Sequence, residues 1–142
     1  MSEYMLRPIG ALAALFLSTQ SAFAVVYDCD ITLPSPDGWM GDKIYFSIDE
    51  KENAVAVYDP LIHEVQEAPM LAELETAPNR YTVRWKLKGL KAIDDIGVRS
   101  KMPTAFYKAV IVRKTNKLML TVNLSAGDNV PSGSGLCSRK EK

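Results

Sequence analysis

The chain has 142 residues with 17 basic and 17 acidic side chains, so it is formally neutral at pH 7. A neutral chain lacks the strong positive field that is typical of proteins that bind nucleic acid or anionic membranes. Neither class of partner is therefore favoured, and the length suits one domain.

The first 24 residues, "MSEYMLRPIGALAALFLSTQSAFA", have the order of a secretory signal peptide. Basic Arg7 precedes an apolar run from Ile9 to Leu17, and Ala22-Phe23-Ala24 resembles a cleavage site. The run is shorter than the ~20 residues that span a bilayer as a helix. We expect residues 1–24 to be a signal peptide and residues 25–142 to be a single β domain, periplasmic or secreted, without a transmembrane segment after cleavage. A short N-terminal membrane anchor is the alternative, and translation could begin at Met1 or at Met5.

From Val25 onward, apolar and polar residues alternate, which is typical of β-strands with one face on a core. Alternation runs through "VYDCDITL" (26–33), "DKIYFSIDE" (42–50), "RYTVRWKLK" (80–88) and "KLMLTVNLS" (117–125), and we also interpret "MLAELET" (70–76) and the more apolar "TAFYKAVIVRK" (104–114) as strands. Turn residues separate these runs. The segment 88–103 is expected to be irregular, with room for a turn of helix.

The order and spacing of these runs predict an all-β domain of about 7–8 antiparallel strands in meander order. Such a sheet must protect its edges, and closure into a small barrel does so. A two-sheet β-sandwich is the alternative.

The two cysteines, Cys29 and Cys137, stand near the two ends of this domain. In an oxidising compartment two cysteines usually pair. Tyr27 and Asp28 before Cys29 do not suit lipid attachment, and the wide spacing does not suit a redox pair. We predict a structural disulfide that joins the first and last strands.

Catalytic and metal-binding patterns are sparse in this sequence. His63 is the single histidine, and no G-x-S-x-G nucleophile motif accompanies it. One free histidine cannot make a usual zinc site, and the acidic segments lack the spacing of a calcium loop. We therefore expect no cofactor, no metal and no enzymatic activity, with His63 at a surface or an edge.

Basic side chains form the first candidate binding surface. Arg84, Lys86 and Lys88 occupy alternate positions and should project from one face of a strand. A second basic group lies around a later hairpin: Lys108, Arg113, Lys114 and Lys117. These cations either keep the sheet from edge pairing or bind an anionic partner, such as a polysaccharide, a lipid headgroup or an acidic protein.

The second candidate is Trp39 with Met40, in "PSPDGWMGD" (34–42). Turn chemistry explains the prolines and glycines of this segment but not the tryptophan. The ring is either a recognition anchor on a loop or a plug for one end of the barrel. Trp39 and Met40 are therefore candidate binding residues.

In layout the sequence resembles small uncharacterised bacterial periplasmic proteins, through Tyr27-Asp28-Cys29, Gly38-Trp39 and Gly135-Leu136-Cys137. This resemblance implies a compartment and a fold. A fainter similarity is to periplasmic inhibitors of c-type lysozyme, eight-stranded barrels that insert a Ser-Gly loop and a Lys-Gly segment into the lysozyme active site. The matching residues here are Ser132-Gly133 and Lys88-Gly89, in reverse order along the chain.

Together these features predict an exported, non-catalytic, monomeric β-barrel that binds a small ligand or a protein in the envelope or outside the cell. The alternatives are a protein inhibitor of a cell-wall hydrolase and an enzyme accessory or structural envelope protein. The barrel interior distinguishes ligand positions: a cavity favours an internal ligand, and a filled interior favours a surface role.

Overall fold

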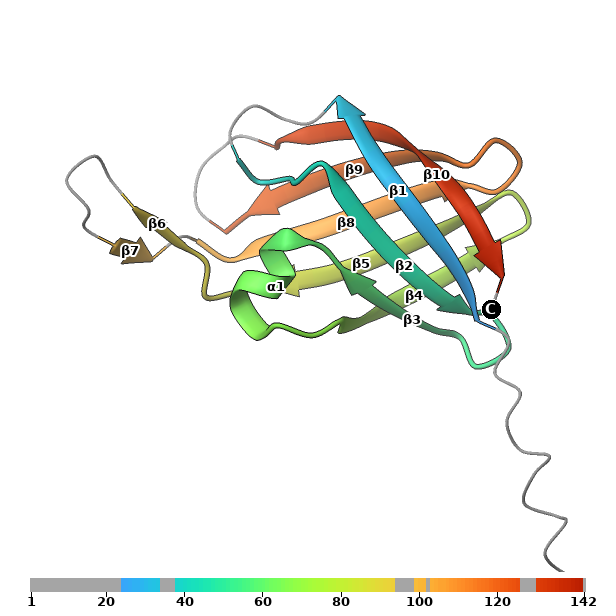
Figure 1. Ribbon diagram of the computed structural model, residues 1–142, viewed down its shortest axis with the longest axis horizontal. Coiled ribbons are helices and arrows are strands. Elements are labelled where there is room, and N and C mark those ends of the chain that lie inside the picture. Colours follow the sequence, from blue (N-terminus) through green and yellow to red (C-terminus); the bar gives the residue numbers. More distant parts are fainter. Residues whose placement is uncertain (1–23, 34–37, 94–98, 102, 126–129, 142) are drawn as a thin grey trace, which may run out of the picture.

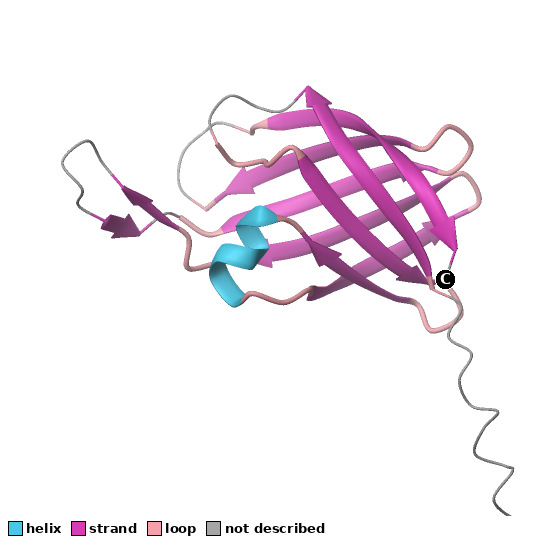
Figure 2. Ribbon diagram, viewed as in Figure 1, coloured by secondary structure: helices cyan, strands magenta, loops and turns pink. Residues whose placement is uncertain are grey.

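The computed structural model describes residues 24–33, 38–93, 99–101, 103–125 and 130–141. Eight antiparallel strands close into a barrel in the order β1-β10-β9-β8-β5-β4-β3-β2, and β6 and β7 form a separate hairpin (Figures 1 and 2). The elements are β1 (Val25–Leu33), β2 (Lys43–Asp49), β3 (Ala54–Tyr58), α1 (Pro60–Gln66), β4 (Met70–Ala77), β5 (Arg80–Leu87), β6 (Lys91–Ile93), β7 (Arg99–Lys101), β8 (Ala105–Val112), β9 (Lys117–Leu124) and β10 (Ser132–Glu141).

The barrel prediction is confirmed, and the sandwich alternative is wrong. Most neighbours in the barrel are consecutive in sequence, as expected for a meander. Two pairings are not: β1 with β10, which closes the barrel, and β5 with β8, which lie side by side because the β6–β7 hairpin leaves the barrel between them. Residues 1–23 of the predicted signal peptide lie outside the described residues.

Two local interpretations need correction. The segment 88–103 was expected to be irregular, but Lys91–Ile93 pairs with Arg99–Lys101 in antiparallel register. Residues 94–98 and 102 of this segment lie outside the described residues. Helix α1 was not predicted. It begins after Asp59, whose side chain accepts a hydrogen bond from the Ile62 N–H at 2.8 Å, and Pro60 occupies the first turn. An Asp-Pro pair at this position is a recognised helix start, so the sequence did carry the signal.

All eight strands of the barrel contribute side chains to its core. Rings meet across it: Tyr27 of β1 lies 5.9 Å from Tyr81 of β5, and Phe46 of β2 lies 6.0 Å from Trp85 of β5, measured between ring centroids. Tyr107 of β8 stacks on Trp85 at 5.1 Å. Because rings from distant strands touch, this part of the interior has no room for a ligand, which favours a role for the outer surface.

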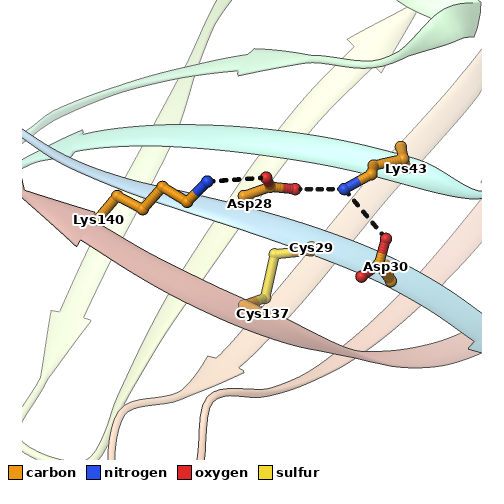
Figure 3. Close-up of polar contacts among 6 residues, drawn as sticks. All are labelled: Asp28, Cys29, Asp30, Lys43, Cys137 and Lys140. Carbon is orange, nitrogen blue, oxygen red and sulfur yellow. Dashed lines mark hydrogen bonds and ion pairs between the residues drawn. A yellow bond between two sulfur atoms is a disulfide. The ribbon is translucent and has the colours of Figure 1, made fainter.

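The first and last strands are joined at a seam. Cys29 and Cys137 are direct partners in the register of β1 and β10, and they form the predicted disulfide (Figure 3). Cys29 is fully buried. Near it, Gly135 of β10 packs so closely on β1 that a Cβ atom there would lie 1.9 Å from the Asp30 carbonyl oxygen. The seam therefore combines a covalent bond with very close backbone packing.

Candidate functional site

Trp39 and Met40 lie in the hydrophobic core, each only 7% exposed. The Tyr107 hydroxyl donates a hydrogen bond to the Trp39 carbonyl at 2.8 Å and ties this segment to β8. This burial is expected if the Trp39 ring plugs one end of the barrel, where it contributes its apolar area to the core. A recognition anchor needs an accessible ring, so the geometry gives no support to Trp39 and Met40 as binding residues. Residues 34–37 before them lie outside the described residues.

The basic candidates are exposed. Arg84 and Lys86 project from the outer face of β5, and Lys88 follows the end of that strand. The register places Lys108 of β8 directly opposite Arg84. One member of the second basic group therefore joins the first group, which the sequence did not predict.

Arg113, from the same second group, has a different environment. Its guanidinium lies 4.5 Å from the centroid of the Tyr81 ring, forms an ion pair with Glu50 at 3.4 Å and donates to the Ala77 carbonyl at 3.1 Å. Burial and then the hydrogen bond to Glu50 raise the pKa of Tyr81 to about 12. Arg113 thus packs over one end of the barrel and is not available to the surface around Arg84.

A hollow of about 360 Å³ lies over the outer face of β5 and β8. We call it the basic groove, and its outward-facing residues are Glu73 of β4, Arg84 and Lys86 of β5, Phe106 and Lys108 of β8, and Asn123 of β9. Lys86, Phe106 and Asn123 are successive register partners across three strands. The Phe106 ring is 45% exposed between the cations. The groove thus combines cations, one aromatic surface and an amide.

Positive charge exceeds negative charge in the basic groove. Arg84 forms an ion pair with Glu75 of β4 at 2.9 Å between Nη1 and Oε1. That contact, with smaller effects of Arg80 and Lys108, lowers the pKa of Glu75, so three cations act on one carboxylate. Lys86 and Lys108 form no salt bridge to any described residue. Like charges directly opposite on adjacent strands, such as Arg84 and Lys108, repel each other.

The seam carries a contrasting set of charges, which we call the seam cluster: Asp28, Asp30, Lys43 and Lys140 (Figure 3). Lys43 Nζ lies 2.8 Å from Asp28 and 3.1 Å from Asp30, and Lys140 Nζ lies 3.5 Å from Asp28. The hydrogen bond from Lys43 lowers the pKa of Asp28, and Lys140 adds to the effect. Asp28 and Asp30 in turn raise the pKa of Lys43. Each cation in this cluster has a carboxylate partner.

His63 lies exposed on α1, as expected for a surface histidine. Its Nδ1 shares a hydrogen bond with the Tyr58 hydroxyl, and both line a shallow hollow of about 380 Å³ with Lys43, Tyr45, Asp59 and Pro60. Burial raises the pKa of Asp59, whose carboxylate is already engaged as the helix cap. Within the part of the chain that the structure describes, no group of three or more His, Cys, Asp or Glu side chains could hold a metal ion.

The residues behind the lysozyme-inhibitor resemblance share one end of the barrel. Ser132-Gly133 opens β10, next to the end of β9, and Lys88-Gly89 follows the end of β5. The β8 and β9 strands separate them, since Leu87 pairs with Ala105 and Ala105 with Leu124.

No protein-family model, no curated protein and no solved structure matches this chain. None of the helices in the described residues is both long enough and apolar enough to cross a membrane.

Proposed function

We propose that this protein is an exported, non-catalytic binding module that holds an anionic ligand in the basic groove. The observation that carries the proposal is the pair Lys86 and Lys108, which flank the half-exposed Phe106 ring and form no salt bridge to a described residue. Exposed cations without internal partners remain available to an external anion, and the ring supplies apolar contact.

Two further observations support this proposal. Rings that meet across the barrel favour a ligand on the outer surface over one in the interior. The disulfide is typical of oxidising compartments, which agrees with the signal-peptide pattern of residues 1–24 and with action in the periplasm or outside the cell.

Calorimetric titration with a galacturonate trimer, a short carboxylated sugar, tests the proposal. Wild-type protein should bind it with an affinity that falls as salt is added, and should not bind the uncharged galactose trimer. The Lys86→Gln/Lys108→Gln variant should lose about tenfold or more in affinity, because charge-assisted hydrogen bonds contribute about 1.5–3 kcal/mol each.

The matched control is Lys114→Gln/Lys117→Gln, which removes the same charge from exposed lysines at the β8–β9 turn. This variant should bind as the wild type does. Equal losses in the two variants, or no binding by the wild-type protein, would contradict the proposal.

A second candidate function, inhibition of a lysozyme-like hydrolase, is favoured by the common position of Ser132-Gly133 and Lys88-Gly89 at one barrel end. Cations beside that end would oppose association with a basic enzyme, which makes this candidate second. A cell-wall lysis assay with c-type lysozyme tests it: inhibition by the wild type that Lys88→Ala abolishes would support it, and undiminished lysis would exclude it.

A further inference from the structure

Among the described residues that line the basic groove, Glu73 is the one acidic side chain. It lies on β4 directly opposite Arg84 in register, but the Arg84 guanidinium forms its ion pair with Glu75. Glu73 itself forms no salt bridge to any described residue. Its exposed carboxylate therefore remains a hydrogen-bond acceptor in a groove whose lysines remain donors.

We infer that the ligand of the basic groove is an acidic sugar with the chemistry of a uronate. Its carboxylate binds Lys86 and Lys108, and its hydroxyl groups donate to Glu73. The apolar face of its ring lies on the exposed Phe106 ring. This inference rests on the proposed function and adds the chemical class of the ligand.

The register places the two lysines where both can reach one carboxylate. Lys86 of β5 lies directly opposite Phe106 of β8, and Lys108 stands two residues further along β8, so the lysines are diagonal neighbours. Diagonal neighbours on paired strands lie about 7–8 Å apart, which two long side chains span easily. The Phe106 ring stands beside the same position, so a carboxylate held by both lysines brings the rest of its molecule onto the ring.

The other side chains of the groove favour a sugar over other anions. The 45% exposed Phe106 ring offers an apolar surface for the C–H face of a sugar ring, and the exposed Asn123 amide can both donate to and accept from hydroxyl groups. Glu73 repels a ligand that is negative on every side, such as a phosphate. A uronate carries its charge on one side and its hydroxyl groups on the other, so it can satisfy the lysines and Glu73 together.

Calorimetric titration compares the galacturonate trimer with tricarballylate, an open-chain acid with the same number of carboxylates but no sugar ring and no hydroxyl groups. Both are titrated at a pH at which all their carboxylates are ionised. Wild-type protein should bind the galacturonate trimer about tenfold or more tightly, because contacts with Phe106, Glu73 and Asn123 are open only to the sugar. The Lys86→Gln/Lys108→Gln variant should lose affinity for both probes.

Three further variants test the sugar contacts. Phe106→Ala/Asn123→Ala should abolish the preference, with a loss of about tenfold for the galacturonate trimer and no change for tricarballylate. Glu73→Gln should tighten the binding of tricarballylate, because a repulsion is removed, but not that of the sugar, because a charged acceptor is lost. The matched control is Leu136→Ala on β10, which truncates a 54% exposed apolar side chain outside the groove and should keep the preference.

The outcomes separate this inference from the proposed function. If wild-type protein binds tricarballylate as tightly as the galacturonate trimer, or if Phe106→Ala/Asn123→Ala keeps the full preference, the sugar assignment is overturned and the proposed function stands. If the Lys86→Gln/Lys108→Gln variant keeps its affinity for both probes, the proposed function itself is overturned. The thermal unfolding midpoint of each variant, compared with that of wild type, confirms that the protein is folded.

Discussion

The seam cluster on β10, β1 and β2 and the basic groove on β5 and β8 lie on opposite sides of the barrel, because β1 and β5 are four strands apart in either direction. Both surfaces carry lysines, but only the seam provides them with partners. Lys43 and Lys140 contact Asp28, whereas Lys86 and Lys108 form no salt bridge to a described residue. At the seam every cation of the cluster has a carboxylate partner, whereas at the groove Arg84 pairs with Glu75 and the two lysines have no such partner among the described residues.

The two surfaces also differ in packing. At the seam, a disulfide and the close approach of Gly135 hold two strands that are distant in sequence. At the groove, the strands are joined by ordinary register pairing, and a large apolar ring is left half-exposed. Substitutions at the seam should therefore change stability and leave binding intact, and substitutions at the groove should do the reverse.

The largest effect on stability is expected for the seam disulfide. Replacing both Cys29 and Cys137 with alanine should lower the free energy of unfolding by about 2–5 kcal/mol, since the bond closes a long loop in the unfolded chain. Urea titration measures the change, and wild-type protein unfolded with a reductant should match the variant. Trimer binding under native conditions should be unchanged. An unaltered urea midpoint would show that the bond does not stabilise the seam.

The next largest loss of stability is expected for Gly135→Ala. The new Cβ would lie 1.9 Å from the Asp30 carbonyl oxygen, which belongs to the backbone and cannot rotate away, so β1 and β10 must separate. Overpacking of this kind costs about 1–3 kcal/mol, and more where the backbone resists. Ser134→Ala is the control on the same strand and should cost much less. Equal stability of the two variants would refute the close packing at the seam.

The seam could be predicted from the sequence, and the groove only in part. Strand alternation, the two cysteines and the need to close the sheet together predicted the neighbours β1 and β10. The pairing of β5 with β8 could not be predicted in the same way, because the intervening segment gave no sign of a hairpin outside the barrel. Phe106 and Lys108 lie in a nearly continuous apolar run, "TAFYKAVIVRK", in which alternation does not reveal the outward face.

The position of the Trp39 side chain could not be predicted from the sequence either. Its turn-like surroundings left an exposed anchor and a buried plug equally open, because a position in a loop does not determine whether the side chain turns inward. The core accepts the ring at this end of the barrel, where the Tyr107 hydroxyl fixes its backbone. Local composition predicts the loop, and only the packing of strands from elsewhere in the chain decides burial.

Asp28→Asn should have a smaller effect than Gly135→Ala and should depend on pH. Lys43, and then Lys140, hold the pKa of Asp28 below its ordinary value of 3.8 in the folded protein. The contribution of these contacts to the free energy of unfolding is therefore complete at pH values above 3.8 and is lost as the pH falls through the folded-state pKa of Asp28. Urea midpoints of wild type and variant should differ at pH 7 and converge in acid. A difference that persists in acid would mean that the contact is not electrostatic.

The smallest effect on stability is expected for Lys108→Gln in the groove, and its sign sharpens the comparison. Lys108 stands directly opposite Arg84, so removing its charge relieves a repulsion and should leave the free energy of unfolding unchanged or raise it by about 0.2–1 kcal/mol. The same change at the seam, Lys140→Gln, removes a partner of Asp28 and should lower the free energy of unfolding. Affinity for the galacturonate trimer should fall for Lys108→Gln and should stay constant for Lys140→Gln. A loss of affinity without a loss of stability is the result expected if Lys108 serves binding, and a marked loss of stability in Lys108→Gln without loss of affinity would assign this lysine to the fold instead.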